Sequence, residues 1–124
     1  MIENPKNEPI DMDELREIMD NDDELAKECF DDFIKIYPSM LVNIKSAIDV
    51  KDPDSLDRTA HKFKGTLKYV AAFHAAEKAY ELEVMGKQKD FEKVTGAFNT
   101  LVEECERAKE YMIQYCEQGM GFKV

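Results

Sequence analysis

Residues 90–116 read DFEKVTGAFNTLVEECERAKEYMIQYC. The apolar residues in this stretch recur at alternating steps of three and four, the spacing that places them along one face of a helix. They are Phe91, Val94, Phe98, Leu101, Cys105, Ala108, Met112 and Tyr115. Asp90 is the predicted N-cap. A long seam of this kind is typical of a helix that packs against antiparallel neighbours in a bundle.

Two helices are predicted in the first half of the chain. Asp11 is the expected N-cap of a short helix over residues 12–19, whose apolar residues share one face. Asn21 is the expected N-cap of a much longer helix that reaches about residue 48 and carries a wide apolar stripe. Pro38 lies inside this longer helix. Because proline removes a backbone donor and clashes with the preceding turn, we expect a kink or a short break near Tyr37.

Two more helices precede the seam. Asp52 followed by Pro53 predicts a helix start, since Asp is a good N-cap and Pro is favoured at the first helical position. The end of that helix is hardly marked, because residues 71–73 contain neither Gly nor Pro. A further helix follows from about residue 75, and Gly86 is expected to end it. The apolar row of the first of these two helices is Leu56, Ala60, Phe63, Leu67 and Val70.

Together these segments predict an all-α fold. Short connections make neighbouring helices antiparallel, so the expected architecture is an up-down-up-down four-helix bundle with a short extra helix at its N-terminus. We expect the bundle to span residues 10–118, with a flexible arm at 1–9 and a C-terminal tail at 119–124. One bundle accounts for all the apolar stripes, so a monomer is expected, and the short tails favour a free-standing protein.

The composition excludes several classes of function. The chain has 124 residues and a net charge of -10, which argues against sequence-independent binding to nucleic acid or to an anionic membrane. Only 5 Gly and 4 Pro are present, too few for a turn-rich β sandwich. No signal peptide is evident, and no apolar run approaches the ~18 residues of a membrane span. We therefore expect a cytoplasmic protein.

The cysteines agree with a reducing compartment. There are three of them, an odd number, and no two have C-x-x-C spacing. This pattern disfavours a disulfide framework or a structural zinc site. Each cysteine falls on an apolar stripe, so we expect buried free thiols. They are Cys29, Cys105 and Cys116.

The most informative residue is His61, which lies off the apolar row of its helix and is therefore expected on the surface. Lys64 follows it at i+3, and Gly65 follows at i+4. A glycine in a helix interior costs about 1 kcal/mol relative to alanine. It leaves space in which another molecule can approach the imidazole, and the lysine can neutralise an anion near the ring. A neutral imidazole is a nucleophile at pH 7, so the pattern is compatible with phosphoryl acceptance, although an exposed histidine is more often a plain surface residue.

The sequence His61-Lys62-Phe63-Lys64-Gly65-Thr66 resembles the H-x-[hydrophobic]-K-G-[S/T] signature of histidine-containing phosphotransfer (HPt) domains, which serve multistep phosphorelays. Ala60, Ala72 and the Leu82-Glu83 pair also fall where that family has similar residues. The resemblance covers roughly residues 10–117. Two departures are visible: Leu67 replaces a usual small residue, and Ala71 replaces a usual glycine, which puts the helix break there in doubt.

The resemblance implies that His61 is the phospho-acceptor, through Nε2. Lys64 would support the phosphorylated state, and Gly65 would permit a partner to dock. The implied partners are receiver domains of response regulators and a hybrid sensor kinase, with the metal ion and catalytic lysine supplied by the receiver. The surrounding docking surface would include Asp57, Arg58, Lys62 and Lys68. Its three basic residues and Lys64 form a locally basic patch on an acidic chain.

By the same resemblance the protein is a phosphoryl carrier, without turnover of its own and without a cofactor. The main alternative is a helical adaptor that binds a signalling partner without phosphotransfer. A metal-dependent bundle enzyme is disfavoured. Such bundles place Glu-x-x-His motifs on facing helices, whereas Arg58 and Ala71 stand three residues before His61 and His74.

Overall fold

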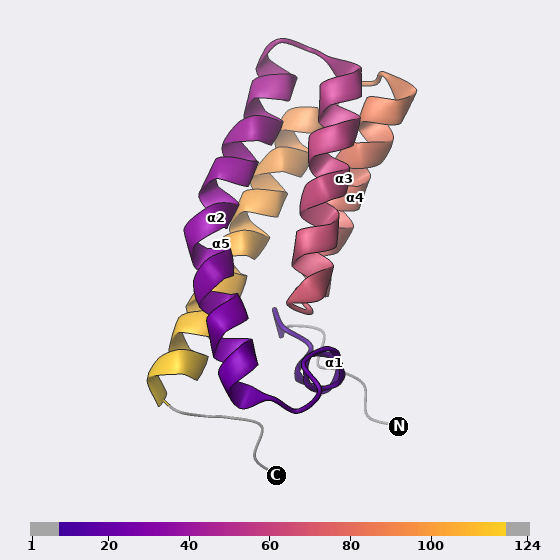
Figure 1. Ribbon diagram of the computed structural model, residues 1–124. Coiled ribbons are helices and arrows are strands. Elements are labelled where there is room, and N and C mark those ends of the chain that lie inside the picture. Colours follow the sequence, from indigo (N-terminus) through magenta and orange to yellow (C-terminus); the bar gives the residue numbers. More distant parts are fainter. Residues whose placement is uncertain (1–7, 119–124) are drawn as a thin grey trace.

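The computed structural model describes residues 8–118 and places five helices there (Figure 1). The expected N-terminal arm and C-terminal tail lie almost wholly outside this range. Within it, no helix is both long and apolar enough to cross a bilayer. The helices are α1 (Met12–Ile18), α2 (Asp23–Asp49), α3 (Pro53–Tyr69), α4 (Phe73–Gln88) and α5 (Val94–Gln118).

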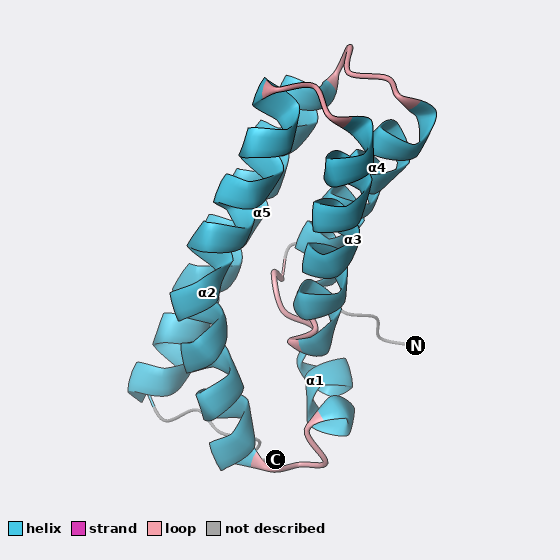
Figure 2. Ribbon diagram, turned by 45° about the horizontal axis from the view of Figure 1, so that its top comes forward, coloured by secondary structure: helices cyan, strands magenta, loops and turns pink. Residues whose placement is uncertain are grey.

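The four longer helices form an antiparallel bundle. Each of α2, α3 and α4 packs against the helix that follows it, and α5 returns to lie beside α2. The short α1 lies across the end of the bundle at which α3 finishes, and the loops between α2 and α3 and between α4 and α5 lie at the other end (Figures 1 and 2). The predicted all-α, up-down-up-down bundle with a short leading helix is therefore confirmed.

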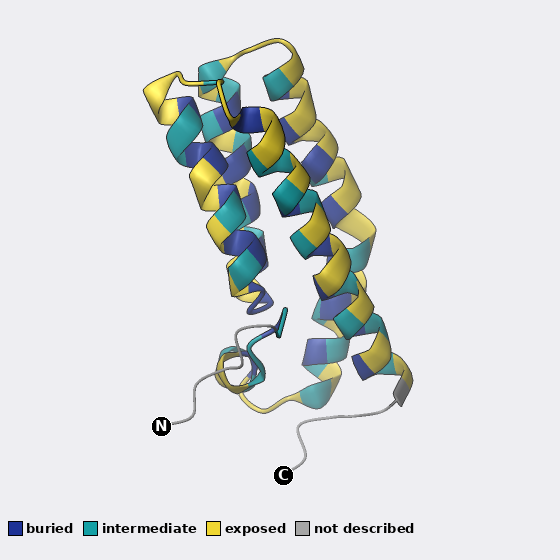
Figure 3. Cartoon of the chain, turned by 180° about the vertical axis from the view of Figure 1, so that it is seen from behind, coloured by how far each residue is buried: buried dark blue, intermediate teal, exposed yellow. Residues whose placement is uncertain are grey.

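Burial follows the predicted apolar stripes. In Figure 3 the buried residues of each long helix face its neighbours, and the exposed residues form the outer surface. Leu101, Cys105, Ala108 and Met112 of the α5 seam are fully buried. Burial also raises the pKa of the Cys105 thiol to about 12. The other two cysteines are half-buried, and all three are free thiols.

Local sequence signals were sufficient to predict the N-cap residues of two helices and missed a third by one residue. Asp11 caps α1 as predicted, accepting a hydrogen bond from the Glu14 backbone at 3.1 Å. Asp52 caps α3 in the same way. The prediction for α2 was wrong by one residue, because Asp22 is the cap and Asn21 adopts a left-handed conformation with φ 59°. Asn tolerates that conformation better than most residues, so it serves the turn and Asp serves the cap.

A kink or a short break was expected near Tyr37, and the break does not form. Helix α2 runs without interruption from Asp23 to Asp49, with Pro38 inside it. Phe33, Tyr37 and Leu41 lie buried on either side of the proline. The apolar surface that these residues remove from water outweighs the one backbone hydrogen bond that proline forfeits.

The junction between α3 and α4 breaks without a glycine. Ala71 adopts φ 59°, and the backbone N–H groups of Ala71 and Ala72 bond back to the last carbonyls of α3. The Ala71 carbonyl in turn accepts a hydrogen bond from the Asp11 backbone at 2.9 Å. A left-handed alanine costs about 1–2 kcal/mol. The contacts of this buried corner, including its link to the start of α1, hold it in place.

The ends of the loop between α4 and α5 also differ from expectation. Gly86 does not end α4, which continues to Gln88 and closes at Lys89 with φ 56°. Asp90 does not cap α5. It accepts a hydrogen bond from the Glu92 backbone at 3.0 Å, and α5 begins four residues later than Asp90, at Val94. Asp90 therefore stabilises a separate turn that precedes the helix.

Candidate functional site

His61 stands on the outer surface of α3, as the sequence predicts. Its side chain is 67% exposed, whereas Ala60 and Phe63 beside it are fully buried in the core. The ring is therefore within reach of a second molecule. The same ridge of α3 carries Asp54, Asp57 and Arg58, which line a shallow hollow together with His61.

A buried carboxylate from α4 orients this ring. Oε2 of Glu83 lies 3.1 Å from Nδ1 of His61, and the Glu83 residue is only 4% exposed. Because an ionised carboxylate can only accept a hydrogen bond, Nδ1 is the nitrogen that carries the proton. In the neutral ring Nε2 then holds the free lone pair.

Lys64 lies on the other side of the same carboxylate. Its Nζ is 2.8 Å from Oε1 of Glu83 and 4.9 Å from the ring centroid of Tyr80, and its side chain is 17% exposed. Burial favours the neutral form of Glu83, but contacts with Lys64 and His61 more than offset this effect, so the pKa of Glu83 is lowered. The anion that Lys64 neutralises in this structure is therefore Glu83.

Lys87 of α4 and Asp57 of α3 form an ion pair next to the Glu83 carboxylate. Nζ of Lys87 lies 3.1 and 3.2 Å from the two carboxylate oxygens of Asp57, and 3.8 Å from Oε2 of Glu83. The hydrogen bond to Asp57 raises the pKa of Lys87. Asp57, which the sequence placed on a docking surface, thus has an intramolecular partner.

The close approach of α3 and α4 depends on Gly86. A Cβ atom at this position would lie 2.6 Å from the backbone nitrogen of Asp57 and 2.9 Å from the carbonyl oxygen of Pro53. Backbone atoms cannot move aside as a flexible side chain would. The absence of a side chain at Gly86 therefore allows the two helices to lie at the spacing at which Glu83 reaches His61.

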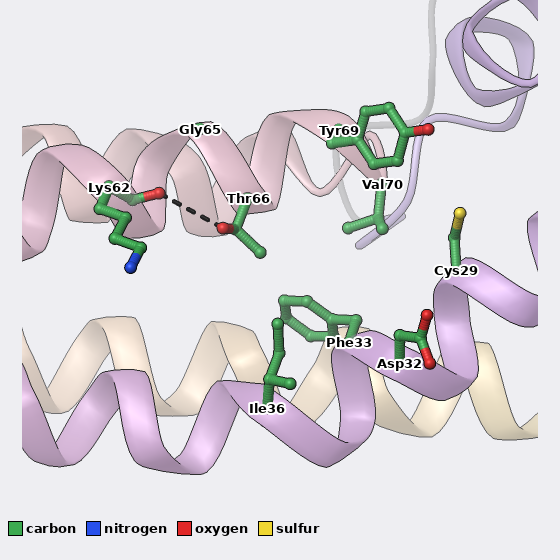
Figure 4. A pocket seen from close by; sticks show the side chains of 9 residues that line it. All are labelled: Cys29, Asp32, Phe33, Ile36, Lys62, Gly65, Thr66, Tyr69 and Val70. Carbon is green, nitrogen blue, oxygen red and sulfur yellow. Dashed lines mark hydrogen bonds between the residues drawn. The ribbon is translucent and has the colours of Figure 1, made fainter.

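Gly65 lies on the exposed side of α3, where a Cβ atom would meet nothing within 4 Å. It borders a groove of about 460 Å³ between α2 and α3. Figure 4 shows this groove, with Lys62, Gly65, Thr66 and Tyr69 on α3 facing Cys29, Asp32, Phe33 and Ile36 on α2. Two of its apolar side chains are well exposed, Ile36 at 44% and Tyr69 at 52%.

The predicted basic patch lies on this same outer surface. Arg58, Lys62 and Lys68 are exposed on α3, on the turns around His61. Within residues 8–118, neither Lys62 nor Lys68 has a carboxylate in ion-pair range, so their charge is available to a partner. His74 does not line the hollow around His61. It lies in a second hollow between α3 and α4, with Phe73 and Tyr80 and with Lys64 and Lys68. In the part of the chain that the structure describes, no three His, Cys, Asp or Glu side chains form a group that could hold a metal ion.

Sequence reasoning gave no role to Glu83, the residue that connects this site. A periodic signal was nonetheless present, because Ala79, Glu83 and Gly86 stand at i, i+4 and i+7 on the face that also carries buried alanines. A glutamate at such a position must find a partner. Two candidates, His61 and Lys64, were already known from the preceding helix.

The family model described as Hpt domain matches residues 28–111, more than half of the chain and both helices of the site. The chain belongs to the Hpt domain family. This membership implies a role in histidine phosphotransfer, and it confirms the resemblance found around His61.

Two further comparisons gave no match for this Hpt domain. Neither the curated proteins nor the solved structures contain a match to it.

Proposed function

We propose that this Hpt domain is a phosphorelay intermediate. His61 accepts a phosphoryl group from the aspartyl phosphate of a receiver domain, or from a sensor kinase, and passes it to another receiver. One observation carries the proposal: an exposed imidazole has its Nδ1 bonded to a buried carboxylate. In the neutral ring this leaves the free lone pair on Nε2. The domain is then a carrier, without turnover of its own.

The transfer step requires little chemistry from the bundle. Nε2 attacks the phosphorus, the N–P bond forms, and the O–P bond to the aspartate breaks, which returns a free carboxylate to the receiver. The proton on Nδ1 stays in its hydrogen bond to Glu83, which stabilises the positive charge that develops on the ring. Phosphoryl transfer depends mainly on alignment and charge neutralisation, so a single oriented histidine suffices.

Lys64 supports this step through Glu83. The ammonium of Lys64 favours the ionised form of Glu83. An ionised carboxylate can only accept a hydrogen bond, so it requires the proton on Nδ1, whereas a protonated carboxyl group could also donate one. The role that the family resemblance assigns to Lys64 is thus proposed to begin before phosphorylation, as part of the arrangement that orients His61.

The groove between α2 and α3 is the proposed docking site of the receiver. Gly65 leaves the approach to His61 open, and Ile36 and Tyr69 offer exposed apolar surface beside it. Arg58, Lys62 and Lys68 supply positive charge around the ring, which complements the acidic active-site pocket expected of a receiver. Exposed basic residues of this kind raise association rates more than affinity.

The proposal is tested by incubation with a receiver domain that carries a labelled aspartyl phosphate. Wild-type protein should acquire an acid-labile, alkali-stable label, and His61→Gln should acquire none while retaining its helical circular dichroism. His74→Gln is the matched control, because that histidine does not line the hollow around His61, and it should be labelled like the wild type. If no receiver from the same organism transfers to the wild type but one binds it, the protein is the alternative helical adaptor.

A further inference from the structure

Lys87 lies between two carboxylates and bonds more closely to one of them. Its Nζ makes two contacts with Asp57, at 3.1 and 3.2 Å, and lies 3.8 Å from Oε2 of Glu83. That oxygen is also the one that accepts the hydrogen bond from Nδ1 of His61. The position of Lys87 therefore bears directly on the carboxylate that orients the ring.

The sequence alone would pair Lys87 with Glu83. The two residues stand at i and i+4 on α4 with the glutamate first, which is the favourable orientation for a helical ion pair. Asp57 reaches across from α3 and draws the ammonium away from Oε2. Without this second carboxylate, the nearest anion to Lys87 is Glu83, and the ammonium would compete with the imidazole for the same oxygen.

We propose that Asp57 is a positioning residue: it holds Lys87 away from Glu83, so that Oε2 of Glu83 remains available to Nδ1 of His61. Its effect on the rate of transfer rests on the proposed function, whereas its effect on the ring is independent of any phosphoryl chemistry. The amide of Asp57→Asn has the shape of the carboxylate but not its charge. Lys87 would then move onto Glu83, and a larger fraction of neutral His61 would carry its proton on Nε2, where it cannot attack.

The ring is observed directly by ¹⁵N NMR of the imidazole nitrogens in the full chain, with the His61 signals assigned from His61→Gln. Wild type should show the Nδ1-protonated tautomer. Asp57→Asn should shift neutral His61 toward the Nε2-protonated tautomer by about two- to fivefold, the change that one partly exposed ion pair carries. Lys87→Met should keep the wild-type tautomer, and the double variant Asp57→Asn/Lys87→Met should return to it.

A matched control removes a comparable charge elsewhere. Asp49 on α2 forms an exposed ion pair with Lys45 and does not line the hollow around His61. Asp49→Asn therefore loses one carboxylate from another helix and should leave the tautomer unchanged. A wild-type tautomer in Asp57→Asn would overturn the proposal. So would a double variant that behaves like Asp57→Asn alone, because Asp57 would then not act through Lys87.

Transfer from a labelled receiver gives the second readout. The rate should fall with Asp57→Asn by about the same factor as the tautomer population, and it should recover in the double variant. If the wild type accepts no phosphoryl group, the proposed function fails, while the NMR series still decides whether Asp57 orients the ring.

Discussion

Glu83 on α4 bonds to His61 on α3 at 3.1 Å, although the two residues are 22 positions apart in the chain. The carboxylate is buried, and the ring that it holds is exposed. This arrangement gives the reactive side chain a fixed partner inside the bundle and a free edge outside it. A rigid support of this kind is what precise alignment for group transfer requires.

Glu83 should make the stability of the bundle depend on pH. Its pKa is lowered from the ordinary value of 4.5, so the folded protein binds fewer protons there than the unfolded chain. The stabilisation is complete above the ordinary pKa and is lost as the pH falls through the lowered one. Glu83→Gln should therefore cost about 1–3 kcal/mol at pH 7 and clearly less at pH 3, measured as free energies of unfolding in urea. An equal cost at both pH values would contradict this reading.

Gly65→Leu should affect stability and transfer in opposite directions. Nothing lies within 4 Å of a Cβ at this position, so the new side chain meets no internal obstacle. Leucine is a better helix former than glycine, and the free energy of unfolding should rise by up to about 1 kcal/mol. The side chain would nevertheless fill the approach to His61, and phosphoryl transfer should slow markedly. Transfer at the wild-type rate would show that Gly65 does not control access.

Gly86→Ala should destabilise the bundle despite alanine's higher helix propensity. The added Cβ would meet backbone atoms of Asp57 and Pro53 at less than 3 Å. Forcing extra volume into such a contact costs about 1–3 kcal/mol. The change should also separate Glu83 from His61, visible as a weaker preference for the Nδ1-protonated tautomer.

The matched control for this glycine is Gly96→Ala on α5. Gly96 is exposed, and a Cβ there meets nothing within 4 Å. The free energy of unfolding of Gly96→Ala should equal that of the wild type or exceed it slightly, since alanine favours the helix. If both alanine variants changed stability in the same direction, the close contact of α3 and α4 at Gly86 would not be the cause.

The amino-acid sequence was sufficient for the fold class because the apolar periodicity of the long helices is strong. Leu101, Cys105 and Ala108 were expected in the core and are fully buried. Helix ends were less predictable, since a local pattern does not reveal what packs against it. Gly86 illustrates this limit: a glycine can end a helix or admit a neighbouring backbone, and only the position of α3 decides between the two.

The site was predictable in part for the same reason. The exposure of His61 follows from its place off the apolar row of α3. The burial of Glu83 depends instead on the helix that crosses it, so its partners could not be read from the local sequence of α4. Asp57 was likewise expected only as part of a docking surface, and Lys87 had no predicted role; their ion pair depends on the packing of α3 on α4.

The tight seating of α3 on α4 at Gly86 has a mechanical consequence. The nucleophilic ring and the carboxylate that aims it are carried on two helices whose backbones are in direct contact, so they form one stiff unit. The groove between α2 and α3, where a receiver is proposed to dock, borders this unit through Gly65 of α3. A force applied there would move the imidazole and its carboxylate together and leave their relative orientation unchanged.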